Sequence, residues 1–140
     1  IMNGSIAKSL SQYYKTEKEK LHPFTISRIE AGFPVSAKQY IESIENAKKM
    51  QQTLNKIFNK FDAIITPAAP GQAPRDLMNT GNAIFNGYWT MMGVPAISLP
   101  LLKGKDSLPI GVQIITSWNE DFKLLKIAEY ILQETKKLAD

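Results

Sequence analysis

The chain has 140 residues and a formal net charge of +4 at pH 7, from 17 basic and 13 acidic side chains. A chain of this length suits one domain, and we expect residues 1–140 to form it, with residues 1–22 as a peripheral helix. The absence of cysteine excludes disulfides and thiolate chemistry and favours a cytoplasmic location. Because the chain opens at Ile1 and not at Met, we expect it to be a piece of a longer protein.

Several classes of partner are excluded by the same composition. Only Arg28 and Arg75 are arginines, and the lysines are scattered, whereas a nucleic-acid surface uses a basic stripe with stacking aromatics or several arginines. A single histidine without cysteine provides no zinc site, and there is no glycine-rich phosphate cradle. No run approaches the roughly 18 apolar residues of a membrane span. We therefore expect no metal, cofactor, nucleic acid or membrane partner.

The first third of the chain is predicted to be helical. Residues 3–20 form a helix that ends in the charged run KTEKEK, and the pair His22-Pro23 then interrupts the chain. Thr25 is predicted to cap a short helix over Ile26–Ala31, with Gly32 as its C′ residue. We expect His22 to serve the structure of this loop.

The longest predicted helix begins at Ser36 and runs for about 25 residues. Ser36 and Gln39 form a capping box, in which the serine caps the helix and the glutamine reaches back. Apolar residues recur at helical spacing, so one stripe packs inward and the helix belongs to an outer scaffold layer. The stripe consists of Tyr40, Ile44, Ala47, Leu54, Phe58 and Phe61.

The stretch from Phe61 to Pro100 is the part of the chain around which a small-molecule site is predicted. Residues 62–66 read as a buried strand, followed by an irregular Pro/Gly loop that ends at Pro74. A short helix over Ile84–Met92, closed by Gly93, leads to a second strand over 95–100. Because ligands bind at the carboxyl ends of strands in α/β sheets, these elements frame one concave binding edge.

The remaining residues add a third strand and a final helix. The polar turn KGKDS precedes a strand over 109–116, in which Gly111 marks a close approach of backbones. Asn119 is predicted to cap the last helix. Its wide apolar arc indicates cover on two sides, and it consists of Phe122, Leu124, Leu125, Ile127, Ala128, Tyr130, Ile131, Leu132 and Leu138. The alternation of buried strands with amphipathic helices predicts an α/β fold.

Several short segments of this sequence resemble the carboxyl-terminal part of the amidase signature family of amide hydrolases. They are ITPAAPGQAP, FNGYWTMMGVPAISLP and LPIGVQII, with RIEAG and VSAKQY upstream, and the likeness covers roughly residues 20 to 135. The resemblance implies part of a three-layer α/β/α fold. It also implies a Ser/cis-Ser/Lys catalytic set on an upstream Gly/Ser-rich segment, where one serine attacks the amide carbonyl.

That upstream segment is missing here, since the chain has no Ser-Ser pair and no GGS word. We therefore assign no catalytic residue to this chain and expect it to be inactive alone. It would supply scaffold and one wall of a pocket for a small-molecule amide. Its expected partners are that substrate, the missing amino-terminal part of the enzyme and, for the isolated fragment, further copies of itself through the strand edge and apolar surface left uncovered.

The candidate binding residues lie at the predicted edge. Thr66 offers a hydroxyl there, and the large side chains suit either a pocket or ordinary core packing. Asn86 and Thr90 share a helical face, from which they could either hydrogen-bond substrate or bridge two loops. Ser98, in a strand, and Asp76, in a turn, are expected to be structural. The candidate set is Thr66, Pro67, Phe85, Asn86, Trp89, Thr90 and Met92.

The resemblance separates two kinds of relative. Glutamyl-tRNA amidotransferase A subunits have an acidic residue near positions 82–83 that reads the glutamine amino group, whereas this chain has Asn82 and Ala83. The RIEAG word places Arg28 near an arginine that pairs with the substrate carboxylate in those subunits, and arginine suits such pairing. We expect a general amidase, with two alternatives: such an A subunit, or a non-catalytic binding or regulatory module of the same fold.

Overall fold

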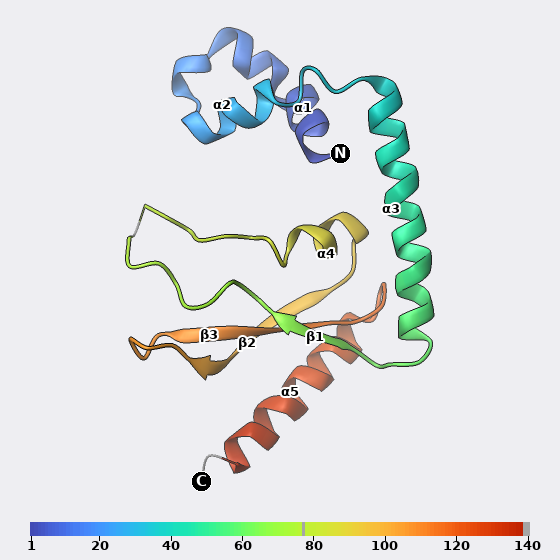
Figure 1. Cartoon of the computed structure of the whole chain (residues 1–140), viewed down its shortest axis with the longest axis vertical. Helices are drawn as coiled ribbons and strands as arrows, with labels where there is room; N and C mark the ends of the chain where they lie inside the picture. Colours follow the sequence, from blue (N-terminus) through green and yellow to red (C-terminus); the bar gives the residue numbers. More distant parts are fainter. Residues whose placement is uncertain (77, 139–140) are drawn as a thin grey trace. The chain divides into compact units, whose positions relative to one another are not determined.

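A computed structural model describes residues 1–76 and 78–138. The chain forms two compact units, Ile1–Lys49 and Met50–Asp140, which we name the helical unit and the sheet unit. Figure 1 labels the elements. In chain order they are α1 (Met2–Thr16), the 3-10 turn η1 (Lys18–Lys20), α2 (Pro23–Glu30), α3 (Ala37–Phe58), β1 (Ile64–Pro67), α4 (Gly87–Met92), β2 (Ala96–Lys103), β3 (Pro109–Ile115) and α5 (Asp121–Lys137).

The helical unit is built on close contact between α1 and α2. Gly32 is buried just after α2, and a Cβ atom there would collide with the backbone oxygen of Asn3 and lie 2.6 Å from Cβ of Ala7. Any larger residue at this position would therefore push α1 away. Gly32 follows the C-cap residue Ala31 and is therefore the C′ residue, as predicted. It is not among the positive-φ glycines, so the glycine is required by packing and not by a left-handed backbone.

The start of α2 also differs from the sequence prediction. His22, and not Thr25, is the N-cap residue, since its ring nitrogen Nδ1 accepts a hydrogen bond from the backbone N–H of Phe24 at 3.2 Å. Pro23 does not break the helix but opens it, because the first helical position has no intrahelical N–H bond to lose. The local structural role expected of His22 is thereby confirmed.

The capping box of α3 is confirmed. The backbone N–H of Ser36 donates to Oε1 of Gln39 at 2.9 Å, and the backbone N–H of Gln39 donates to Oγ of Ser36 at 3.2 Å. Ala47 and Leu54 of the predicted stripe are buried. Phe61 is not part of that stripe, because α3 ends at Phe58 and Phe61 is exposed.

The sheet unit contains a three-stranded antiparallel sheet in the order β1-β3-β2. Both outer strands run antiparallel to β3 and hence parallel to each other, so their carboxyl ends lie at the same edge. The register aligns Thr66, Gln113 and Ser98 across the three strands. The expected strand ends are shifted: β1 begins at Ile64 rather than at residue 62, and β2 continues past Leu99, through an irregularity, to Lys103.

Helices cover both faces of this sheet, which gives the expected three layers (Figure 1). On one face, α5 buries Leu124 and Ala128 against Leu99 and Ile114. On the other face, Ile115 packs with Met92 of α4, with Val94 and with Leu54. Ile114 and Ile115 point to opposite faces because side chains alternate along a strand, and both are fully buried.

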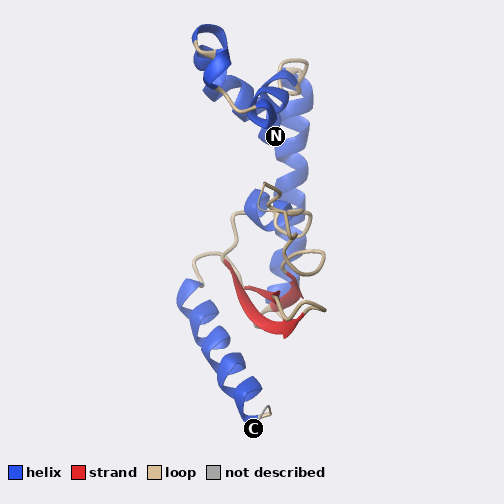
Figure 2. Cartoon of the chain, turned by 90° about the vertical axis from the view of Figure 1, so that its left-hand side faces the viewer, coloured by secondary structure: helices blue, strands red, loops and turns tan. Residues whose placement is uncertain are grey.

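The last helix is covered on one side only. Figure 2 shows α5 lying along the sheet, while Phe122, Leu125 and Tyr130 are exposed. This chain therefore provides the cover on one side of α5 and leaves uncovered the apolar surface expected of it; cover of the second side by another part of the protein stays a prediction. The prediction that Asn119 caps the helix is wrong: Glu120 is the N-cap residue, and Asn119 has a left-handed backbone with φ of 59°.

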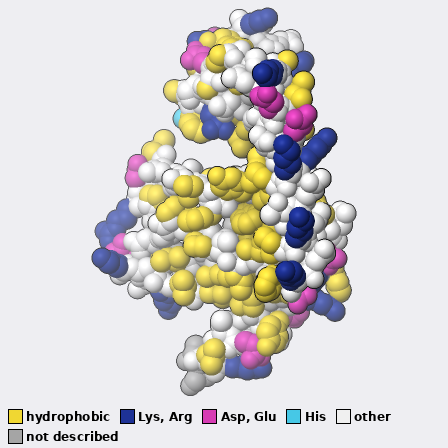
Figure 3. Space-filling model, turned by 45° about the vertical axis from the view of Figure 1, so that its right-hand side comes forward, with side chains coloured by type: hydrophobic (Ala, Val, Ile, Leu, Met, Phe, Trp, Pro, Cys, Tyr) yellow, Lys and Arg dark blue, Asp and Glu magenta, His cyan; other side chains and the backbone are white. Residues whose placement is uncertain are grey.

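Exposed hydrophobic side chains extend beyond α5. Figure 3 shows a broad area of them on the face of the sheet unit turned to the viewer. The large exposed ones in this unit include Ile65, Ile84 and Leu102. Among residues 1–76 and 78–138, no helix combines the length and apolar character needed to cross a membrane.

Candidate functional site

Two cavities lie at the edge of the sheet where β1 ends. The first, which we name the apolar cavity, has a volume of about 460 Å³. The second, the polar cavity, has a volume of about 620 Å³ and lies under the loop that follows β1. The two share Ala69, Pro70, Gly71 and Gly111 in their walls. Both volumes are in the range of pockets that hold small molecules.

The apolar cavity is built from strand ends and one aromatic side chain. Its wall is almost wholly aliphatic, apart from Phe85 and the hydroxyl of Thr66. The lining residues are Ile65, Thr66, Pro67, Ala69, Pro70, Gly71, Phe85, Leu102, Ile110, Gly111 and Val112. An apolar wall with a single hydroxyl suits the hydrocarbon part of a ligand with one polar group.

The polar cavity is bounded mainly by the loop over residues 68–82, with Ser98, Pro109 and Gly111 from the sheet. Much of the loop's polarity is used within the loop. Asp76 Oδ1 accepts from the backbone N–H of Met78, Asn79 Oδ1 from Gly81, and Asn82 Oδ1 from Ile84, each at 2.9 Å. Such Asx turns shape the backbone locally, which confirms the expected turn role of Asp76.

Gln113 joins three elements of the sheet unit and lines neither cavity. Its side chain is buried, with 7% exposure, in an otherwise apolar strand. Its Nε2 donates to Asn86 Oδ1 at 2.8 Å, and Asn86 Nδ2 donates to the backbone oxygen of Ala68 at 3.4 Å. Thr66 Oγ1 lies 3.5 Å from Gln113 Oε1. This chain of amides fixes the start of α4 and of the loop against the sheet, because buried polar groups are costly to leave unpaired.

The short helix α4 is held at both ends. Its N-cap residue, Asn86, makes no side-chain cap, since the amide is engaged with Gln113 and Ala68. Gly93 closes the helix with φ of 67°, as predicted. The backbone oxygen of Met92 then accepts from Trp118 Nε1 at 2.7 Å and from Gln51 Nε2 at 3.1 Å. The helix begins at Gly87 and not at the expected residue 84, because residues 84–86 form a turn that leads into it.

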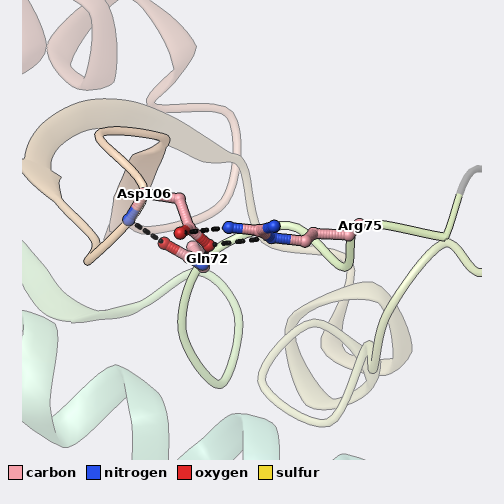
Figure 4. A network of polar contacts seen from close by, with 3 residues as sticks. All are labelled: Gln72, Arg75 and Asp106. Atoms are coloured by element: carbon pink, nitrogen blue, oxygen red, sulfur yellow. Dashed lines mark hydrogen bonds and ion pairs between the residues drawn. The ribbon is translucent and has the colours of Figure 1, made fainter.

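A second polar cluster ties the loop to the turn between β2 and β3 (Figure 4). The guanidinium of Arg75 makes a two-pronged contact with the carboxylate of Asp106, with Nε donating to Oδ2 at 3.2 Å and the second nitrogen to Oδ1. Gln72 Nε2 donates to Oδ2 of the same carboxylate at 2.6 Å, and Gln72 Oε1 accepts from the backbone N–H of Asp106 at 3.3 Å. Arg75, followed by Gln72, holds the pKa of Asp106 below its ordinary value.

Comparison with known proteins identifies the family. The sequence profile of the family described as Amidase matches residues 2–125. The chain belongs to the Amidase family. It is 31% identical over 144 residues to the A subunit of the glutamyl-tRNA(Gln) amidotransferase of Clostridium botulinum (strain Eklund 17B / Type B), an alignment that covers 94% of this chain and 30% of that protein. It thus spans about a third of the length of the curated relatives it matches.

Solved structures share the fold of this chain. A structure described as an amidase superposes with a TM-score of 0.83 at 21% identity, covering 94% of this chain and 33% of that one. A 6-aminohexanoate cyclic dimer hydrolase superposes with a TM-score of 0.68 at 19% identity, covering 88% and 30%. These likenesses confirm the α/β fold class. Together with the match to the Amidase profile and the identity to the A subunit, they confirm the amidase signature resemblance.

Within this Amidase family chain, the predicted site residues fall into three groups. Thr66, Pro67 and Phe85 line the apolar cavity, whereas Asn86 lines neither cavity and bonds to Gln113 and Ala68. Met92 is buried in the core and Trp89 packs against it, so these two fit the core-packing interpretation. The exposed Thr90 lies one turn after Asn86. Binding by any of them stays a prediction.

Arg28 belongs to the helical unit, whereas the other candidates belong to the sheet unit. Its guanidinium contacts Met2 Sδ at 2.7 Å and lies over the ring of Phe24, with 5.9 Å between the guanidinium carbon and the ring centroid. A role for Arg28 in binding a substrate carboxylate stays a prediction.

Sequence reasoning missed several residues of the site. It placed Ser98 in a buried strand, but Ser98 is exposed and lines the polar cavity, because no described helix covers the sheet face at this end. It did not single out Gln113, although a lone amide between valine and isoleucine in a strand is a usable signal. Arg75 pairs with Asp106, which lies 31 residues away, and no local sequence pattern predicts that pair.

Proposed function

We propose that this chain is the carboxyl-terminal part of an amidase that hydrolyses a small-molecule carboxylic amide. In this proposal a Ser/cis-Ser/Lys set on residues outside the chain carries out the reaction, and the chain supplies scaffold and one wall of the substrate pocket. The observation that carries the proposal is the pair of cavities at the shared carboxyl edge of β1 and β2. These cavities are lined by residues of the sequence segments that resemble the family.

The chain's own residues assign it a binding role and no catalytic one. His22, the one histidine, uses its Nδ1 to cap α2. Ser98 opens onto the polar cavity, but no histidine or lysine is among the described residues that line it. A serine without a base in hydrogen-bond reach is a weak nucleophile. We therefore propose that the isolated chain binds amides and does not hydrolyse them.

In this proposal, different residues of the pocket wall contact different parts of the substrate. The aliphatic side chains and Phe85 of the apolar cavity take the hydrocarbon part of the substrate. Thr66 presents a hydroxyl at the end of β1, which lies 3.3 Å from the backbone oxygen of Pro67 and 3.5 Å from Gln113 Oε1. The amide group of the substrate would face the catalytic set supplied from outside this chain.

A second candidate, the A subunit of a glutamyl-tRNA(Gln) amidotransferase, is favoured by the 31% identity to that protein. The residues at positions 82 and 83 disfavour it. Asn82 carries no negative charge, and its side-chain oxygen is engaged with the backbone N–H of Ile84. Neither Asn82 nor Ala83 offers a carboxylate to an amino group.

The test is amide binding by the chain itself. We would titrate hexanamide, a neutral aliphatic amide, into the nitrogen-15-labelled chain and follow amide resonances by NMR. The proposal expects shifts at Thr66, Gly71 and Gly111, and weaker binding for Phe85→Ala. The matched control is Tyr88→Ala, which removes an exposed aromatic from α4 that lines neither cavity.

Binding of hexanamide elsewhere, or equal affinities for Phe85→Ala and the control, would contradict the proposal. Tighter binding of glutamine than of hexanamide would favour the second candidate. Ammonia release by the purified chain would contradict the assignment of catalysis to other residues. We also propose that the parent protein is cytoplasmic and that the isolated chain self-associates; sedimentation equilibrium showing only a 15.7 kDa monomer would contradict the latter.

A further inference from the structure

The loop beside the two cavities carries very little charge. Between Ala63 and Leu102, Arg75 is the only basic residue and Asp76 the only acidic one. Asp76 shapes a turn through its bond to Met78. The residues on either side of Arg75, Pro74 and Asp76, both line the polar cavity. Arg75 is therefore the one cation that this stretch can present at the cavity rim.

The charge of Arg75 is already neutralised. Figure 4 shows its guanidinium directed at the carboxylate of Asp106, where the two groups make a two-pronged contact. This is the geometry in which arginine binds a carboxylate most strongly. A substrate carboxylate that approached Arg75 would have to displace Asp106 from the same nitrogen atoms.

The turn that carries Asp106 is fitted to the loop. Gln72 lies directly on Gly104, where a Cβ atom would lie 3.0 Å from Cβ of Gln72 and collide with its amide oxygen. Gln72 also bonds both the carboxylate and the backbone N–H of Asp106. The carboxylate is thus held in place by several contacts, which favours it over a free anion through its high effective concentration.

We propose that Asp106 is a specificity-determining residue, which withholds Arg75 from carboxylate-bearing ligands and so reserves the site for uncharged amides. This inference rests on the proposed function of the cavities and names the substrate class that they accept. The residue acts from the turn between β2 and β3, outside the lining of either cavity.

The first test compares the affinities of two probes that differ only at one end of the molecule. Hexanamide ends in a methyl group, and adipamate carries a carboxylate in its place. The Asp106→Asn variant keeps the shape of the side chain at position 106 while removing its charge and replacing one acceptor oxygen by an NH2 donor. For this variant we expect adipamate affinity, relative to hexanamide, to rise by about threefold or more, the effect of one exposed ion pair.

A double variant identifies the source of that gain. Asp106→Asn combined with Arg75→Gln should return the affinity ratio to that of the unaltered chain. If the gain survives the loss of Arg75, another cation provides it and the inference is wrong. Arg28→Gln, combined with Asp106→Asn, should leave the gain in place.

The second test needs no ligand. Phenylglyoxal modifies free guanidinium groups, and the chain has only two arginines, so Arg28 provides an internal reference. We expect Arg75 to react more slowly in the unaltered chain and several times faster, relative to Arg28, in Asp106→Asn. An unchanged ratio of the two modification rates, read by mass spectrometry, would show that Asp106 does not withhold Arg75.

The two proposals fail in different ways. Absence of binding for both probes, with every variant folded by circular dichroism, would overturn the proposed function and the specificity with it. Binding of hexanamide without any gain for adipamate in Asp106→Asn would overturn the specificity alone. Preference for adipamate in the unaltered chain would do the same.

Discussion

The two ends of the sheet differ in how they are filled. At one end, Ile114, Ile115 and Thr116 are fully buried between α5 and the α4 layer. At the other, β3 passes through Gly111 and Gln113 beside two cavities, and Pro67 and Leu102 on the neighbouring strands are exposed. The filled end supplies stability, and the open end uses that rigid support to hold polar groups and empty volume in place, as binding sites require.

The largest expected effect compares two isoleucines that are register partners on the same face of the sheet, Ile65 and Ile114. Ile114 is 0% exposed and Ile65 is 61% exposed. Ile114→Ala should lower the free energy of unfolding by about 2–5 kcal/mol through lost burial and a cavity. Ile65→Ala should change it by less than about 0.5 kcal/mol.

Urea unfolding followed by tryptophan fluorescence measures both variants, because Trp89 and Trp118 both lie in the sheet unit. The comparison requires an unchanged denaturant slope. Similar losses for the two variants would mean that the edge strand β1 is also covered in solution.

The next effect concerns the close approach at the open end. A Cβ atom on Gly111 would lie 2.9 Å from Cβ of Ala68 and would collide with Oγ of Ser98. Ser98 can rotate away, but Ala68 cannot, so Gly111→Ala should destabilise the sheet unit by about 1–3 kcal/mol. Gly87→Ala is the control, since nothing lies within 4 Å of a Cβ there and helix propensity favours alanine. Equal effects in urea unfolding would contradict this.

An effect of similar size tests the bond between the amides of Gln113 and Asn86. Gln113→Leu removes the donor to Asn86 Oδ1 and leaves a partly buried amide unpaired, at a cost of about 1–3 kcal/mol. It should also broaden or shift the NMR resonances of Asn86 and Ala68. Gln133→Leu, on the exposed side of α5, should stay within about 0.5 kcal/mol of the unaltered chain. A stabilising Gln113→Leu would show that the network serves position and not stability.

The smallest effect is a pH dependence. Because Arg75 and Gln72 lower the pKa of Asp106, their contact stabilises the chain above the ordinary carboxyl pKa and is lost as pH falls through the lowered value. The difference in urea midpoint between the unaltered chain and Asp106→Asn should therefore be constant from about pH 5 to about pH 8 and vanish in stronger acid. A difference that grew toward low pH would have the wrong sign.

The filled end of the sheet can be predicted from sequence and the open end only in part. Apolar runs and the turn at KGKDS indicate three strands, and capping chemistry predicts the start of α3, because these signals are local. Sequence reasoning misassigns the cap of α2 because a histidine ring nitrogen does what a threonine hydroxyl usually does. It expects cover on the exposed side of α5 because the composition of that helix is apolar over a wide arc.

The candidate site is harder to predict because its contacts join distant residues. Thr66, Pro67 and Phe85 follow from their places at the ends of elements. Gln113 is 27 residues from Asn86, and Gln72 is 34 residues from Asp106. Such pairs depend on register and loop path, which a single sequence does not specify. The Asx turns of Asp76, Asn79 and Asn82 are within reach of sequence reasoning, because each spans only two residues.

The hydrogen bonds of Asn86 bear on chemical ageing. Asn86 precedes Gly87, and asparagine-glycine pairs deamidate when the glycine nitrogen attacks the asparagine side chain to form a succinimide. Here the backbone N–H of Gly87 donates to the oxygen of Ala83 at 3.3 Å, and the Asn86 amide is fixed by Gln113 and Ala68. The folded site therefore keeps the Gly87 nitrogen away from the Asn86 side-chain carbonyl carbon. The rate at which Asn86 deamidates during storage then measures how often this end of the sheet opens.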